Sequence, residues 1–253
     1  MKKELLEKYA RLLVCTGVAI QKGQLLVIWA PVEQYAFVRL IEEEAYRAGA
    51  GSVHVNWEDD ELFRLALQHE SFESLEKIMP WLVSRKEQQQ KMGCAILKIT
   101  MPKPDLLNGV DAKRIAARIK AERQAFYPLQ DYTMNNHGQW CVAAASGPAW
   151  AHKIFPDEPI ETAVDHLWEV IFQTIRLDAD HDPREAWKRY SASLHKRCDF
   201  LNEAAFSYLH FKNELGTDLK VRLPKGHIWG GGSETALDNG VVFQPNMPTE
   251  EVF

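Results

Sequence analysis

Apolar runs of strand length alternate with amphipathic segments through the first 145 residues, and this alternation constrains the fold most strongly. The runs at 24–30 and 51–57 flank the segment 34–50, whose apolar residues recur with helical spacing until Gly49. A strand, a helix of about a dozen residues and another strand form a βαβ unit with a parallel pair of strands. Its crossover is right-handed in nearly all known cases.

The same alternation continues beyond the first unit. It predicts helices over 61–69, 72–90 and 111–127, and strands over 94–100 and 139–145. Strands that alternate with helices in this way form a mostly parallel sheet with helices on both faces. The sequence therefore predicts an α/β fold for this part of the chain.

The pattern changes after residue 145. Helical signals fill 148–202, whereas the side chains of 206–223 alternate between apolar and charged around a turn at Gly216. We therefore expect an N-terminal α/β domain at 1–205 and the start of a β-rich domain, of α+β character, at 206–253. The second unit is smaller than the size at which a separate core is usually stable, so we expect it to be incomplete.

Composition excludes several classes of partner. With a formal net charge of -5, the chain lacks the basic footprint of nucleic-acid binding. Its four cysteines are widely separated and form no C-x-x-C pair, which favours buried thiols in a reducing compartment. Charged residues interrupt the N-terminal apolar residues, and no apolar run approaches the roughly 20 residues that span a bilayer. We expect a soluble, cytoplasmic protein without a membrane partner.

Other common chemistries have weak support. The glycine-rich stretches 49–55 and 230–240 lack both the dinucleotide fingerprint and the P-loop lysine, so a dinucleotide-dependent oxidoreductase is disfavoured. No G-x-S-x-G elbow for a serine hydrolase is present. The nine histidines never form H-x-x-x-H or H-E-x-x-H. Only His210 and His227 qualify as residues near a site, and an ordinary structural role is commoner for both.

The stretch "NMPTEEVF" at 246–253 contains two neighbouring carboxylates, Glu250 and Glu251. Pro248 disfavours helix for the residue before it, so the segment should be extended and should place the two carboxylates on opposite faces. Only one of them can then face a given cavity. From spacing alone, a solvated charge pair at a strand edge is the commoner interpretation.

Several segments nevertheless resemble the thermophilic metallo-aminopeptidase family of the aminopeptidase T and aminopeptidase S type. The likeness covers essentially the whole chain, and its most specific motif is the last. The segments are "DHLWEVIFQTIRLD" at 165–178, "DPREAW" at 182–187, G-T-D-L at 216–219, G-H-x-W-x-G-G at 226–232 and N-x-P-T-E-E-V-F at 246–253.

The resemblance implies a dinuclear metallo-exopeptidase that removes N-terminal residues from peptides, usually as a homodimer. It makes Glu251 the candidate metal ligand and Glu250 at most a neighbouring catalytic acid. The implied cofactors are two divalent cations of the zinc or cobalt class, which polarise the scissile carbonyl and lower the pKa of a bridging water. Trp229 and Phe253 are candidates to line the substrate cavity, although a core role fits each equally well.

The other ligands that the resemblance implies, a further Glu, two His and an Asp, would follow the last motif. We therefore expect the chain to be the truncated front part of a longer enzyme. It should be inactive alone, because a single carboxylate holds a divalent ion only weakly. Residues 1–205 would then enclose the substrate cavity. The alternative is a non-catalytic α/β module for ligand binding or dimerisation.

Overall fold

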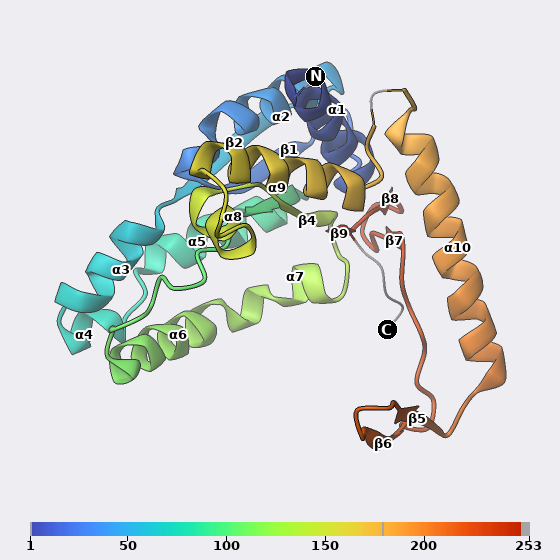
Figure 1. Cartoon of the computed structure of the whole chain (residues 1–253). Coiled ribbons are helices and arrows are strands. Elements are labelled where there is room, and N and C mark those ends of the chain that lie inside the picture. Colours follow the sequence, from blue (N-terminus) through green and yellow to red (C-terminus); the bar gives the residue numbers. More distant parts are fainter. Residues whose placement is uncertain (1, 179, 249–253) are drawn as a thin grey trace.

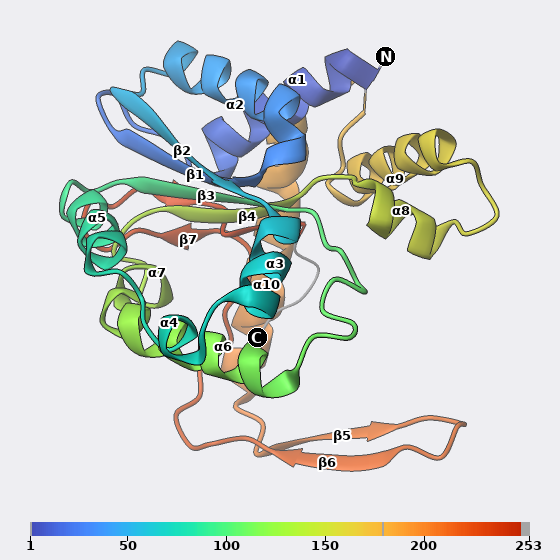
Figure 2. The ribbon, with the colours of Figure 1, turned by 90° about the vertical axis from the view of Figure 1, so that its left-hand side faces the viewer.

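The structure, a computed structural model, describes residues 2–178 and 180–248 and contains a five-stranded sheet (Figure 1). All neighbouring strands run parallel, in the order β2-β1-β3-β4-β9. Helices cover both faces of the sheet (Figure 2), so the predicted α/β fold with a mostly parallel sheet is confirmed. The strands are β1 (Leu25–Pro31), β2 (Ser52–Glu58), β3 (Ala95–Thr100), β4 (Trp140–Ala144) and β9 (Asn246–Met247).

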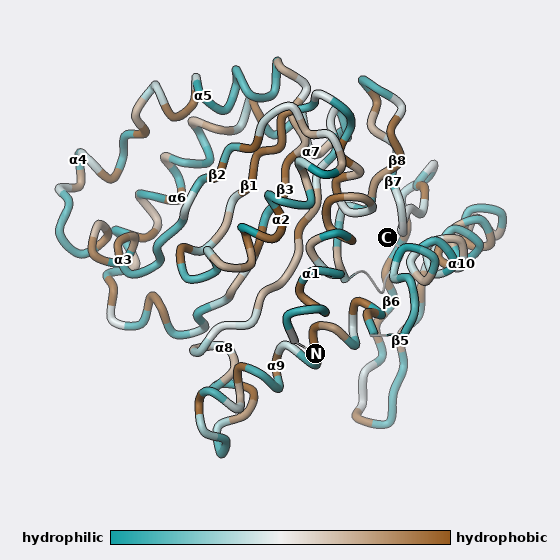
Figure 3. Tube along the Cα trace, turned by 90° about the horizontal axis from the view of Figure 1, so that it is seen from above, coloured by the Kyte–Doolittle hydropathy of each residue, from teal (hydrophilic) through white to brown (hydrophobic). Residues whose placement is uncertain are grey.

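The strands β1 and β3 are neighbours in the interior of the sheet, and Figure 3 shows that both are largely apolar. Leu26, Val27 and Ile28 of β1 are all essentially buried, although successive side chains point to opposite faces. Burial on both faces explains why β1 reads as a continuous apolar run rather than an alternating one.

One face carries the main core. Its covering elements are α1 (Lys2–Leu12), the π-helical turn η1 (Leu13–Gly17), the 3-10 turn η2 (Val32–Gln34), α2 (Tyr35–Arg47), α8 (Pro148–Ile154) and α9 (Ile160–Thr174). Aromatic rings join these helices: Tyr9 of α1 stacks on Phe37 of α2 at 5.3 Å between centroids, and Phe37 meets Trp168 of α9 at 5.6 Å. The Tyr9 hydroxyl donates to the Ala144 carbonyl at 3.1 Å, and burial raises its pKa.

The other face has a smaller core, centred on Val27, Cys94 and Tyr132. The single helix predicted over 72–90 is wrong, because Met79 adopts an extended conformation and α5 begins at Pro80. A proline disfavours helical dihedrals in the residue before it. The covering elements are α3 (Asp60–His69), α4 (Phe72–Leu75), α5 (Pro80–Lys91), α6 (Ala112–Phe126), η3 (Tyr127–Leu129) and α7 (Asp131–Met134).

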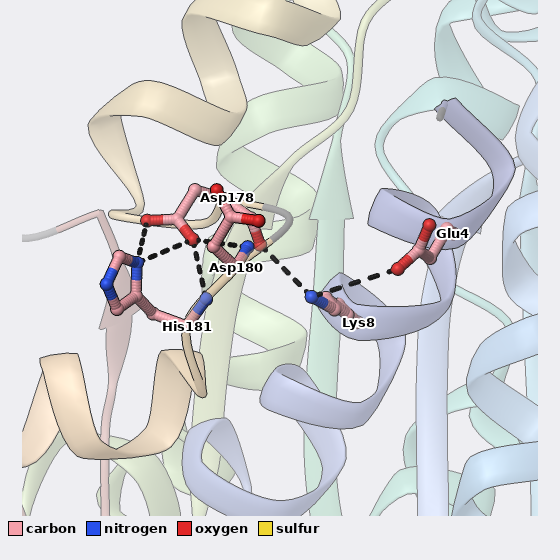
Figure 4. Close-up of polar contacts among 5 residues, drawn as sticks. All are labelled: Glu4, Lys8, Asp178, Asp180 and His181. Atoms are coloured by element: carbon pink, nitrogen blue, oxygen red, sulfur yellow. Dashed lines mark hydrogen bonds and ion pairs between the residues drawn. The ribbon is translucent and has the colours of Figure 1, made fainter.

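A polar loop leads from α9 to the long helix α10 (Pro183–Ala204). Asp178 organises the loop, since its Oδ1 accepts the backbone N–H groups of Asp180 at 2.9 Å and His181 at 2.8 Å (Figure 4). These hydrogen bonds, the one from His181 above all, lower the pKa of Asp178. Lys8 of α1 donates to the Asp178 carbonyl at 3.3 Å and so joins the loop to the main body.

After α10 the chain forms an exposed antiparallel hairpin, β5 (Tyr208–Lys212) and β6 (Asp218–Arg222), which projects away from the sheet (Figures 1 and 2). The predicted turn at Gly216 is present, with a φ of 94°. A second small sheet of β7 (Glu234–Thr235) and β8 (Val242–Phe243) follows, and the chain then returns to the main sheet through β9. The division into 1–205 and 206–253 stays a prediction.

None of the helices in the described part of the chain is long and apolar enough to cross a membrane.

Candidate functional site at the carboxyl edge of the sheet

The motif N-x-P-T-E-E-V-F begins in β9, the edge strand of the main sheet. Asn246 pairs with Val142 of β4, whose N–H donates to the Pro245 carbonyl at 2.8 Å. Met247 is 1% exposed and belongs to the main core, which explains why so short a strand holds its place. Because β9 is parallel to β4, the chain leaves it at the same edge of the sheet at which β4 ends.

The residues that the sequence predicts to carry the chemistry follow directly. Glu250, Glu251 and Phe253 lie outside the described residues, so the predicted ligand, acid and lining roles stay predictions.

Gln244 fixes the segment that leads into β9. Its backbone N–H is shared between the carbonyls of Gly17 at 2.8 Å and Thr16 at 3.1 Å, in the π-helical turn. Its side-chain Nε2 donates to the Gly232 carbonyl at 2.9 Å. Gln244 is 2% exposed, and a buried amide needs such partners. It therefore joins the G-H-x-W-x-G-G motif, the first helical segment and β9.

The loops after β1, β3 and β4 meet at the carboxyl edge, where parallel α/β sheets usually bind ligands. Gln34, which follows β1, donates from Nε2 to the Ser146 carbonyl at 2.8 Å. The same nitrogen lies 3.1 Å from the sulfur of Met101, which follows β3. One buried side chain therefore spans the loops of three strands.

Acidic groups also gather at this edge, around Lys103. Its ammonium lies 3.0 Å from Glu33 and 3.8 Å from Glu61. Burial alone would lower the pKa of Lys103, but the hydrogen bond to Glu33 and the neighbouring carboxylates raise it. Burial also raises the pKa of Asp60, with Lys103 opposing and Glu33 and Glu58 adding to the shift. The lysine therefore compensates much of the negative charge at this edge.

The described residues do not by themselves fit a metal ion. Within 2–178 and 180–248, no group of three or more His, Cys, Asp or Glu side chains could hold one. His210 pairs with Asp218 across the hairpin at 2.6 Å, and His227 donates from Nδ1 to the Pro224 carbonyl at 2.9 Å. Because the hairpin projects away from the sheet, His210 is not brought together with β9 (Figure 1).

Trp229, a predicted lining residue, is held from α10 by Asn202. The backbone N–H of Trp229 donates to the Asn202 Oδ1 at 2.7 Å, and the Asn202 Nδ2 donates to the backbone carbonyl of Trp229 at 3.0 Å. The indole Nε1 is buried and has no hydrogen-bond partner among the described residues. The backbone position is thus fixed, while the lining role stays a prediction.

A cavity of about 500 Å³ lies between α10, the π-helical turn and β8. The helix lines it with Arg184, Lys188, Ser191 and His195. These positions follow one another at intervals of four, three and four residues, so they share one face of the helix. The sequence contains the signal for this polar face, although the helical signals over 148–202 predict only that the segment is helical. Cys15 lines the opposite wall, and burial raises the pKa of its thiol.

The G-H-x-W-x-G-G motif ends against this face of α10. The Ser233 N–H donates to Ser191 Oγ at 2.8 Å, and the Ser233 carbonyl lies 3.1 Å from His195 Nε2. Gly232 has a φ of +86°, and a Cβ there would lie 2.9 Å from Ser191 Oγ. Both the backbone conformation and the close approach therefore require glycine at this position.

Comparison with known proteins gives a family match along the whole chain. The family model described as "Thermophilic metalloprotease (M29)" matches residues 2–253. The chain is 41% identical to aminopeptidase AmpS of Bacillus subtilis over 248 residues, which are 98% of this chain and 60% of that protein. It is 39% identical to aminopeptidase T of Thermus thermophilus over 251 residues, 99% of this chain and 61% of that protein.

A solved structure agrees with these matches. Wild-type AmpT from Thermus thermophilus superimposes with a TM-score of 0.92 at 36% sequence identity, covering 100% of this chain and 61% of that one. The chain thus spans about 60% of the length of the curated relatives it matches.

Proposed function

The chain belongs to the thermophilic metalloprotease (M29) family, and we propose that it serves the metal-dependent removal of amino-terminal residues from peptides. The observation that carries this proposal is the family match over residues 2–253, together with 36–41% identity to proteins named as aminopeptidases. The fold supports it as well, since the described residues superimpose on AmpT with a TM-score of 0.92.

We assign Glu251 the role of a metal ligand and Glu250 that of a neighbouring acid. Two divalent cations of the zinc or cobalt class are the proposed cofactors. Position supports the assignment, because the chain leaves β9 at the carboxyl edge of a parallel sheet. The two glutamates follow within four residues of Met247. The described residues form no metal-binding group of their own, so they are proposed to supply the scaffold rather than the centre.

Residues 1–205 are proposed to enclose the substrate rather than to carry out the chemistry. Gln34 spans the loops at their carboxyl edge and Lys103 lies among its carboxylates, and no metal-binding group arises there from the described residues. Short peptides are the proposed substrates, and a homodimer in the cytoplasm is the proposed state.

Hydrolysis of leucyl-p-nitroanilide tests the proposed function. The assay uses the protein encoded by the full gene, after chelation and after addition of Zn²⁺ or Co²⁺. We expect activity to be lost on chelation and to return with metal. Absence of activity in every condition would instead favour a non-catalytic ligand-binding or dimerisation module.

A further inference from the structure

A second cavity, of about 260 Å³, lies on the face of the sheet opposite the main core. Val27 and Trp29 of β1 and Ile96 of β3 form its apolar wall, and α5 closes it from the other side.

Lys86 of α5 lines this cavity without a counter-ion. Its ammonium makes no hydrogen bond or ion pair with any described residue, and it lies over the ring of Phe126, 5.3 Å from the ring centroid. Burial lowers its pKa, because the charged form loses hydration that no carboxylate replaces. The other lysine in the lining, Lys98, differs in being paired with Glu58.

Gln89, one turn along the same helix, also lines the cavity. It is 9% exposed, and its side-chain amide makes no hydrogen bond with the described part of the protein. Its amide is not fully buried, so it stays accessible to a ligand that enters the cavity beside the Lys86 ammonium. The two groups together offer a positive charge and an amide donor.

We propose that this cavity binds a small organic carboxylate with a single apolar body. The carboxylate would contact Lys86 and Gln89, and the apolar body would pack against Trp29 and Ile96. No Asp or Glu among the described residues lines the cavity, and one unpaired cation matches a monoanion. The volume lies below the usual range of roughly 300–1,000 Å³ for drug-sized ligands, which limits the body to one ring or one branched chain. The proposal does not depend on the peptidase activity.

Calorimetric titration of the full 253-residue chain tests this site, with 3-phenylpropionate and 4-methylpentanoate as probes. Their uncharged amides serve as ligand controls. We expect at least one carboxylate to bind with a Kd below about 1 mM, and its amide to bind at least about tenfold more weakly. The substitution Lys86→Gln should weaken binding of the carboxylate by a similar factor. Lys91→Gln, an exposed lysine on the same helix that pairs with Glu87, should leave binding unchanged.

Failure of both carboxylates to bind, or equal binding by wild type and Lys86→Gln, overturns the proposal. If Lys86→Gln does not fold, Gln89→Leu replaces it under the same criterion. Amide chemical shifts of the wild-type chain give an independent readout, since they should change on α5, β1 and β3 when the carboxylate binds. Changes confined to other elements would place the ligand elsewhere and contradict the proposal.

Discussion

At the scale of single residues, Gly232 carries the most specific structural demand in the motifs. Alanine there would have to adopt a positive φ, which should lower the free energy of unfolding by about 1–2 kcal/mol. Its Cβ would also crowd Ser191 and His195, which should lower the free energy of unfolding by about 1–3 kcal/mol more. Gly240 provides the matched control, because its φ is +72° and a Cβ at that position would point into open space. Urea unfolding should therefore show a larger loss for Gly232→Ala than for Gly240→Ala. Equal losses of unfolding free energy in the two variants would mean that the packing of the motif on α10 does not contribute to stability.

At the scale of elements, His137 links α7 to the turn between β7 and β8. Its Nδ1 lies 2.8 Å from Asp238 and its Nε2 lies 3.1 Å from Asp131. The hydrogen bond to Asp238, with smaller contributions from both carboxylates, raises the pKa of His137. A raised pKa in the folded state means that the protonated form stabilises the fold. This contribution is fully present below the unfolded-state pKa and is lost as pH rises through the folded-state pKa.

Asp238→Asn should therefore lower the pKa of His137, which an NMR titration of the ring protons measures directly. The difference in unfolding free energy between wild type and Asp238→Asn should be larger at about pH 5 than at about pH 9. An unchanged pKa, or a difference that is independent of pH, would show that the link is not electrostatic.

The elements differ in how far the sequence predicts them. The strands β1 and β3 are recognisable because both of their faces are buried, and α2 because its apolar residues keep helical spacing. The periodicity over 72–90 passes through Pro80 without a visible break, so it predicted one helix where the structure has two. The strand β9 has two residues and no periodicity, because long-range contacts of Gln244 and Met247 position it.

At the scale of the whole molecule, the motifs of the sequence identified the family, but spacing alone did not locate the site. Glu250 and Glu251 became candidates through resemblance, whereas the polar face of α10 was visible as a repeat of three and four residues and was not recognised. The cavity beside Lys86 could not be predicted, because it depends on which groups remain unpaired after β1, β3 and α5 pack together. Pairing of this kind is a property of the folded molecule.

The most direct test of the central claim is kcat/KM for leucyl-p-nitroanilide, measured in the complete protein with Zn²⁺ or Co²⁺ for wild type, Glu251→Gln and Glu250→Gln. If Glu251 is a metal ligand, its substitution should lower kcat/KM at least about 100-fold and reduce the bound metal. Glu250→Gln should retain the bound metal and lose less activity. Full activity and full metal content in Glu251→Gln would contradict the account.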